Sequence, residues 1–176
     1  MKKLVLAALA ASAAIATPAF AGTPDTGTVA VTGSVAGKCL FTTKNESIPA
    51  GELAGADGKL DATPLTSPTK TLVGWCNQSA STMTVTAKPL IGSTPTTDAS
   101  FTNRIDIDAQ ATAAGKTATD SSTGEAGPTY TAGTGQIVGI FSGNIDVKIT
   151  AASAGGKILT QGNYNGSIDV TLTPAV

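Results

Sequence analysis

The sequence predicts an all-β fold, a β-sandwich of immunoglobulin-like kind, and three observations lead to this prediction. Apolar and polar residues alternate with a period of two in many short segments, as in strands with one buried and one solvated face. Thr, Val and Ile, which suit a pleated surface, fill these segments. Clusters of Gly, Pro, Asn, Asp and Ser separate them, and no later stretch has the 3.6-residue apolar period of a helix. Many short strands joined by turns are typical of a sandwich.

The chain begins with a predicted export signal, residues 1–21. Two lysines follow Met1, residues 4–16 are rich in Ala and Leu, and Ala19 and Ala21 have the small-x-small spacing of a cleavage site. The alternative is an N-terminal anchor helix, but the apolar run is short against the ~20 residues that a membrane span needs. We predict cleavage after Ala21 and export into an oxidising compartment.

A polar leader and an alternating segment follow, over residues 22–36. Val29, Val31 and Val35 fall on one side of an extended chain together with Gly33, and polar or small residues fall on the other side. A self-contained sandwich has no need of such a leader, and an exposed strand edge is an association hazard unless it is protected or used. We predict an N-terminal extension at 22–36 and a sandwich domain at 37–176.

The chain has two cysteines, Cys39 and Cys76. In an oxidising compartment, two cysteines in a small domain most simply form one disulfide. The alternative is redox or nucleophilic chemistry, which neither a Cys-x-x-Cys motif nor a histidine supports, since the sequence has none. The sequence therefore predicts a structural disulfide.

The remaining elements follow from the same patterns. Alternating or continuously apolar runs predict strands at 71–75, 82–87, 105–109, 136–141, 145–149 and 167–173. Clusters of turn-forming residues predict loops at 51–58, 64–68, 92–97 and 154–156. The polar stretch 111–135 is either an exposed loop or contains a weakly patterned strand. Tyr164 is expected to mark a sandwich corner or the lead into the last strand.

Composition argues against most chemical activities. The absence of histidine removes the usual proton shuttle and the commonest metal ligand, and a net charge of -1 gives no electrostatic footprint for nucleic acid. Asp106 and Asp108 look like a carboxylate pair, but no pocket is predicted around them, so we expect a solvated strand face. We predict no enzyme activity, no cofactor and no metal site.

Three segments together carry a resemblance to a known family. They are the alternating run Gly27–Cys39, the stretch Cys76-Asn77-Gln78 with the strand that follows it, and the terminal run Gly162–Pro174. In order and spacing they resemble chaperone–usher pilus subunits, especially the archaic branch with Csu-type pilins and spore coat protein U-like domains. The resemblance covers both ends of the chain and leaves the middle, about residues 90–140, unmatched.

The resemblance implies an incomplete sandwich that lacks its final strand. A periplasmic chaperone fills the resulting groove transiently, and the N-terminal segment of the next subunit fills it permanently. It implies Val29, Val31, Gly33 and Val35 as donor-strand residues. It also implies neighbouring pilin subunits and an outer-membrane usher as partners, and a route through the periplasm to a surface pilus or fimbria that supports adhesion or biofilm.

Two rival functions remain open at this point. A monomeric secreted binding module, for example for carbohydrate, would present exposed aromatics on one face, and the aromatic content is 4%. A hydrolase would need a catalytic triad or a carboxylate pair in a cleft, and the sequence predicts neither.

Overall fold

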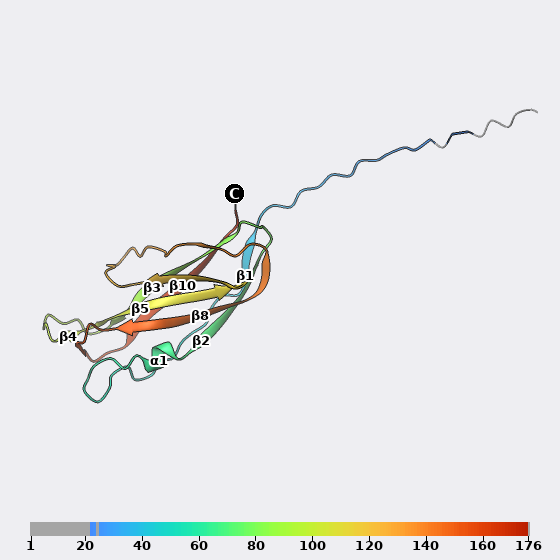
Figure 1. Ribbon diagram of the computed structural model, residues 1–176. Helices are drawn as coiled ribbons and strands as arrows, with labels where there is room; N and C mark the ends of the chain where they lie inside the picture. Colours follow the sequence, from blue (N-terminus) through green and yellow to red (C-terminus); the bar gives the residue numbers. More distant parts are fainter. Residues whose placement is uncertain (1–21, 24, 176) are drawn as a thin grey trace, which may run out of the picture. The chain divides into compact units, whose positions relative to one another are not determined.

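The structure is a computed structural model that describes residues 22–23 and 25–175 (Figure 1). Strands make up 47% of the described residues and helix 3%, so the all-β prediction is confirmed. Residues Val35–Val176 form one compact unit. The predicted export signal, with Ala19 and Ala21, lies outside the described residues. Within the described part, no helix has the length and apolar character that crossing a membrane requires.

Ten strands and one short helix make up the described fold. In chain order they are β1 (Cys39–Thr43), α1 (Thr63–Thr66), β2 (Thr69–Cys76), β3 (Thr82–Gly92), β4 (Phe101–Thr102), β5 (Arg104–Ala113), β6 (Lys116–Ser121), β7 (Gln136–Ile137), β8 (Phe141–Ser153), β9 (Ile158–Leu159) and β10 (Tyr164–Thr173).

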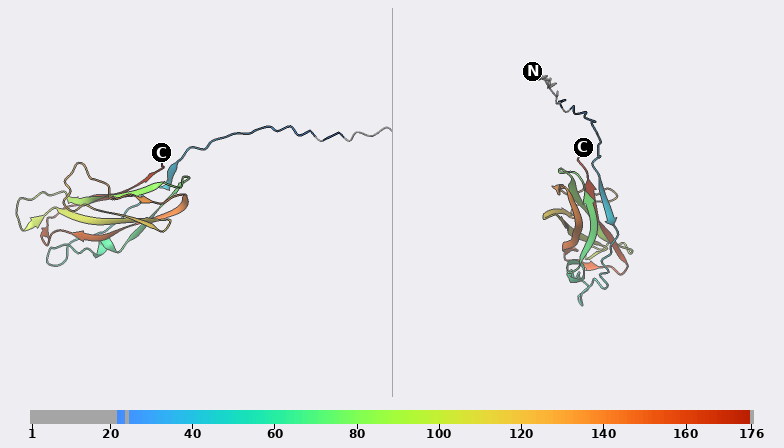
Figure 2. Two further views of the ribbon diagram at one scale, coloured as in Figure 1. Left: turned by 45° about the horizontal axis from the view of Figure 1, so that its top comes forward. Right: turned by 90° about the vertical axis from the view of Figure 1, so that its right-hand side faces the viewer.

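The main strands form a nearly closed sheet in the order β1-β2-β8-β5-β3-β10, an arrangement consistent with a β-sandwich (Figures 1 and 2). Neighbours along this path are antiparallel. β6 adds to β5, β7 adds to β3, and β4 forms a separate parallel pair with β9. β5 and β3 pair only where Leu90 and Ile91 meet Ile105 and Arg104, so the path splits there into two parts.

The core is built from alternate residues of the long strands. These are the positions that the period-two pattern assigned to the buried face, and they are almost completely enclosed: Met83, Val85, Ala87, Ile105, Ile107, Ala109, Ile145, Val147 and Ile149. Burying one Val or Ile side chain is worth roughly 1.5–3 kcal/mol, so this cluster supplies much of the driving force for folding.

The predicted disulfide is confirmed. Cys39 lies directly opposite Cys76 in the β1–β2 register, and their sulfurs are bonded. Cys76 is buried, and β2 pairs in turn with β8 along its whole length. The bond therefore ties the short edge strand β1 to β2, which is paired on both sides.

The segment around Pro64 differs from its prediction. Instead of a turn, residues Thr63–Thr66 form the single-turn helix α1, with Pro64 in its first turn, where the missing N–H costs nothing. Leu65 is buried from this helix and belongs to the core cluster. Asp61 accepts a hydrogen bond from the Thr63 amide at 3.0 Å, and this bond holds the pKa of the Asp61 carboxyl below its ordinary value.

The polar stretch 111–135 contains strand β6, which is the second of the two alternatives. β5 and β6 form a hairpin whose two-residue turn is Ala114-Gly115, both with positive φ, as a tight hairpin turn requires. Sequence patterning did not decide between the alternatives because only Ala118 on this strand is buried. The chain beyond β6 then returns along β3.

That returning chain covers the outer edge of β3. The Gly133 amide donates to the Val85 carbonyl at 2.9 Å, and the Val138 amide donates to the Ser81 carbonyl at 2.9 Å. The Asp120 carboxylate accepts from the Ala87 amide at 2.7 Å, and β7 pairs with the start of β3. Backbone groups that would otherwise form an open sheet edge are thus bonded within the chain.

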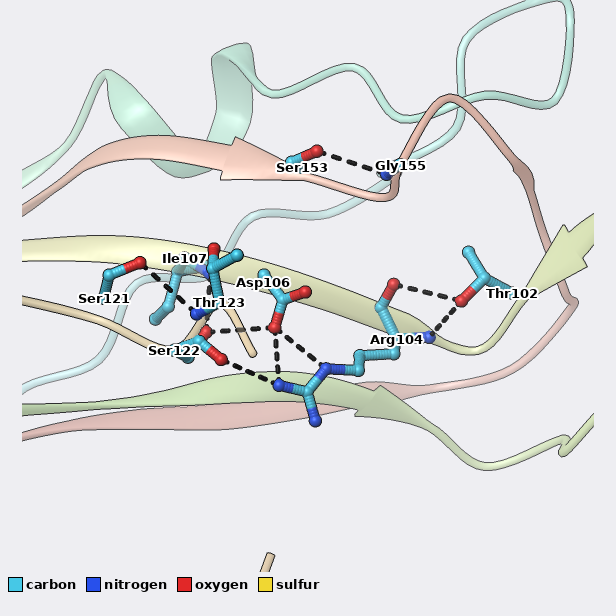
Figure 3. A network of polar contacts seen from close by, with 9 residues as sticks. All are labelled: Thr102, Arg104, Asp106, Ile107, Ser121, Ser122, Thr123, Ser153 and Gly155. Carbon is cyan, nitrogen blue, oxygen red and sulfur yellow. Dashed lines mark hydrogen bonds and ion pairs between the residues drawn. The ribbon is translucent and has the colours of Figure 1, made fainter. Parts of the chain in front are cut away.

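The carboxylate pair on β5 also differs from its prediction, because Asp106 does not lie on a solvated face. Its side chain is 26% exposed and forms an ion pair with Arg104 at 2.6 Å (Figure 3). Arg104 also donates to the Ser122 carbonyl at 2.8 Å, and the Ser122 hydroxyl donates to Asp106 at 3.3 Å. The loop after β6 folds over this part of β5, which no local pattern around Asp106 reveals.

We expect Ser122→Ala to lower the free energy of unfolding by about 1–3 kcal/mol, because the substitution leaves a buried N–H without its acceptor. Ser122 is fully buried, and its hydroxyl accepts from the Ile107 amide at 2.8 Å. Urea denaturation measures the effect. Ser121→Ala is the matched control, since Ser121 is exposed and expected to change stability by less than about 0.5 kcal/mol. Equal effects of the two substitutions would contradict the assignment.

Candidate functional site

An open groove of about 690 Å³ lies between β10 on one side and β2 with residues 41–48 on the other. We call it the β10 groove. The charged residues of its lining are Lys44, Glu46, Lys70 and Asp169. Its apolar lining includes core side chains from both parts of the sheet and from α1: Leu65, Leu90, Ile107, Val147 and Ile149. The groove thus opens directly onto the hydrophobic core.

The inward face of β10 is incompletely covered. Ile168, Val170 and Leu172 face the core and are only half-buried. Their antiparallel neighbours on β3, Ala87, Val85 and Met83, are 0% exposed. β3 and β10 share one core but differ sharply in burial. β3 has neighbouring segments along both of its edges, whereas β10 has a neighbouring strand along one edge only.

The backbone of β10 is equally incomplete. Among the described strands β10 pairs only with β3, and β1 pairs only with β2. β1 ends at Thr43, and residues 44–50 continue without strand structure. A row of β10 backbone groups therefore faces the groove without a strand partner in the described chain. An unpaired edge over an apolar floor is a template for adding a strand.

Tyr164 fixes the start of β10, as expected for a corner or a lead into the last strand. Its hydroxyl donates to the Thr160 carbonyl at 2.9 Å, four residues upstream. Its ring packs so closely on Gly92 that a Cβ at that position would come within 2.7 Å of it. The Gly is therefore required there, and the Tyr side chain anchors one end of the β10 groove, which it lines.

The opposite end of β10 is closed. Leu172 packs against the backbone of β2, since a Cβ on Gly74 would meet its Cδ1 at 3.2 Å. The β10 groove accordingly reaches from Tyr164 to Val170 and does not include Leu172. The disulfide lies at this closed end, because Cys76 is two residues beyond Gly74 on β2.

Residues just before β1 are held by their own domain. Asn77 donates to the Ala36 carbonyl at 3.0 Å and accepts from the Lys38 amide at 2.6 Å. A Cβ on Gly37 would overlap the side chain of Gln78. These contacts, which sequence reasoning missed, fix the chain to the domain from Ala36 onward.

The predicted donor residues are among the most exposed in the structure. Val29, Val31 and Val35 are 88%, 92% and 88% exposed, and Gly33 has no atom within 4 Å of an added Cβ. No strand or bridge is assigned in the described residues before Cys39. The three valines form an exposed apolar stripe, and contact of this apolar surface with water is unfavourable in free energy. Their pairing with a groove stays a prediction.

The described residues do not gather three or more His, Cys, Asp or Glu side chains in a group able to hold a metal ion. The chain's sequence and structure match no family model, no curated protein and no solved structure. Function must therefore be inferred from the residues and geometry of this chain.

Proposed function

We propose that this protein is the structural subunit of a surface fibre of chaperone–usher type, and that it polymerises by donor-strand complementation. In this reaction the β10 groove of one copy receives the segment 27–35 of a second copy. Two features of the chain carry the proposal: an unpartnered strand edge over an open core, and an exposed segment with alternating valines in which no strand is assigned.

The strand order supports an immunoglobulin-like sandwich without its last strand. An immunoglobulin domain packs a sheet A-B-E-D against a sheet that contains C, F and G. The partial paths β1-β2-β8-β5 and β3-β10 match A-B-E-D and C-F in order and in chain sequence. The Tyr164 hydroxyl bonded to Thr160 is the tyrosine corner expected at the start of strand F. On this assignment the β10 groove is the vacant place of strand G.

The chemistry of the segment suits that place. An added strand gains affinity from main-chain hydrogen bonds and specificity from alternate side chains that enter the core. Val29, Val31 and Val35 supply such side chains, and each is worth roughly 1.5–3 kcal/mol when buried. The segment between Thr28 and Val35 has no charged residue, so it carries no charge into the groove.

The direction of the added strand follows from where the chain is held. In a strand antiparallel to β10, Val35 of the donor copy lies at the Tyr164 end of the groove, and the donor domain continues from there. A parallel strand would bring the donor domain to the Leu172 end, where the acceptor's own Gly37 lies near Ala175, within 3.6 Å of its carbonyl if a Cβ is added. Antiparallel insertion therefore avoids a clash and joins copies head to tail, which gives an open fibre.

Subunits of such a fibre need assembly proteins that protect them before they polymerise. An open apolar groove and a free apolar stripe on each copy promote uncontrolled association. Two partners would prevent this association. A periplasmic chaperone would fill the groove, and an outer-membrane usher would exchange the chaperone for the next donor segment. The predicted export signal supports this route to the cell surface.

Deletion of residues 22–36 tests the proposal. We expect the full-length protein, expressed with its export signal, to run on unheated denaturing gels as a ladder of multimers that collapses on boiling. The ladder should disappear in the deletion variant, because the donor strand is gone. Thr32→Ala, which changes the opposite face of the same segment, should keep the ladder. A stable monomer in both full-length and deleted forms would overturn the proposal and favour the monomeric binding module.

A further inference from the structure

We infer that Asn77 makes the junction between successive copies stiff, because its side chain holds the base of the N-terminal segment against the domain. The inference rests on the proposed function. It concerns the residues that join two domains, which lie outside the β10 groove. Asn77 is a positioning residue in this inference, since it acts through residues 36–38, the last residues before β1.

The side chain of Asn77 bonds to the chain on both sides of Gly37. Its Nδ2 donates to the Ala36 carbonyl at 3.0 Å, and its Oδ1 accepts from the Lys38 amide at 2.6 Å. The Asn77 amide adds a third bond, to the Lys38 carbonyl at 3.0 Å. One side-chain partner is an acceptor and the other is a donor, so a side chain here must both donate and accept, as an amide does. An aspartate would keep the bond to Lys38 and lose the bond to Ala36.

These bonds extend the pairing of β1 with β2 beyond its last assigned pair. Cys39 lies opposite Cys76, and the same register places Lys38 opposite Asn77. In an ordinary antiparallel pair the Lys38 amide would donate to a backbone carbonyl. Here the Asn77 side chain takes the place of that carbonyl. The junction therefore begins directly beside the disulfide, where β1 is covalently tied to β2.

Gly37 would be a flexible point without these bonds. The side-chain oxygen of Gln78 is buried and occupies the space where a Cβ of residue 37 would lie, and the Ala175 carbonyl is 3.6 Å from that position. The site therefore requires glycine, the residue with the greatest backbone freedom in an unrestrained chain. If Asn77 did not hold its two neighbours, Ala36 and Gly37 would form a short hinge.

The position of these bonds leaves no free linker in the proposed fibre. The compact unit begins at Val35, and the proposed inserted segment ends at the same residue. Ala36, which follows it, is already bonded to the domain. Every residue of the junction is then held either by the groove of the acceptor copy or by the donor's own domain. Because flexible linkers are what allow joined domains to reorient, we expect a fibre that resists bending.

Asn77→Ala in the full-length protein tests the inference. The multimer ladder on unheated gels should persist, because the valines of the inserted segment are unchanged. Trypsin should cleave after Lys38 about tenfold faster, because the loss of two hydrogen bonds raises the population of the opened chain. Electron microscopy of the isolated fibres should show a shorter persistence length. Asn77→Asp, which keeps one bond, should fall between the two. Ser79→Ala is the matched control, since Ser79 is exposed on the same loop.

The outcomes separate the stiff junction from donor-strand assembly. A normal ladder with faster cleavage after Lys38 and more strongly bent fibres supports the inference. A normal ladder with unchanged cleavage or unchanged bending would overturn the inference and leave the proposed function standing. A parent protein that forms no ladder would overturn both.

Loss of the ladder in Asn77→Ala has two readings, which urea denaturation separates. If the midpoint equals that of the parent, Asn77 is needed for insertion and not for stiffness, and the inference is wrong. If the midpoint falls, the variant is destabilised as a whole, and the cleavage rate and persistence length of Asn77→Asp decide by the same criteria.

Discussion

Val31→Asp is expected to abolish multimer formation while it leaves the domain intact. Val31 is 92% exposed in the structure, so an aspartate there costs the isolated domain almost nothing. In the proposed fibre the same side chain would be buried in the β10 groove of the next copy, where an unpaired charge costs about 3–5 kcal/mol. Because about 1.4 kcal/mol is tenfold in affinity, association should weaken by more than about 100-fold. The multimer ladder on unheated gels measures this loss.

Ala30→Asp is the matched control. Position 30 is the neighbour of Val31 and lies on the opposite face of an extended strand, where an inserted segment meets solvent. This variant should assemble as the unchanged protein does. Urea denaturation of both variants should give the same midpoint as the parent domain. Equal loss of assembly in the two variants would mean that charge on the segment, and not its buried face, decides association.

Removal of the disulfide is expected to have the largest effect on stability. Cys39→Ala/Cys76→Ala should lower the free energy of unfolding by about 2–5 kcal/mol, because the unfolded chain loses the constraint of a closed loop. Without the bond, β1 is held to β2 by strand pairing alone, and the chain from Phe41 in β1 to Ile48 lines the β10 groove. We therefore expect weaker multimers together with the lower stability. Urea denaturation and the unheated gel measure the two effects.

Reductant provides the control for the disulfide prediction. A thiol reductant should destabilise the parent protein by a similar amount, and it should not change the double variant, whose described chain has no other cysteine. A parent protein whose denaturation curve is the same with and without reductant, under conditions where thiol titration shows the bond reduced, would contradict the prediction.

Local patterns predicted most of the fold. The buried faces of β3, β5 and β8 follow from strict alternation in segments such as Met83–Ala87 and Ile105–Ala109, because each residue's burial depends on its own strand. The disulfide followed from composition and compartment. α1 was missed because one helical turn is too short for a period, and its formation depends on where Leu65 packs.

The β10 groove was beyond local patterns. The alternation of Ile168, Val170 and Leu172 predicts a strand with one buried face, but it does not tell whether a neighbour covers that face. The half-burial of these residues depends on the order of strands far apart in sequence. The Asn77 contacts with Ala36 and Lys38 are equally long-range. The Ser122 hydroxyl that donates to Asp106 also comes from a segment distant in sequence. Only the valine stripe of the N-terminal segment was visible in the sequence itself.

The chain that runs along the outer edge of β3 has a consequence for how a fibre grows. Gly133 and, from β6, Asp120 bond to β3, and Val138 bonds to Ser81 just before it, so these backbone groups are not free to pair with another molecule. If copies join by donor-strand complementation as proposed, each copy has one strand to donate and one edge to fill, and such bivalent units produce unbranched filaments. Loosening this returning chain would add a third point of attachment. In the proposed fibre, the chain after β6 would therefore favour linear over branched assembly.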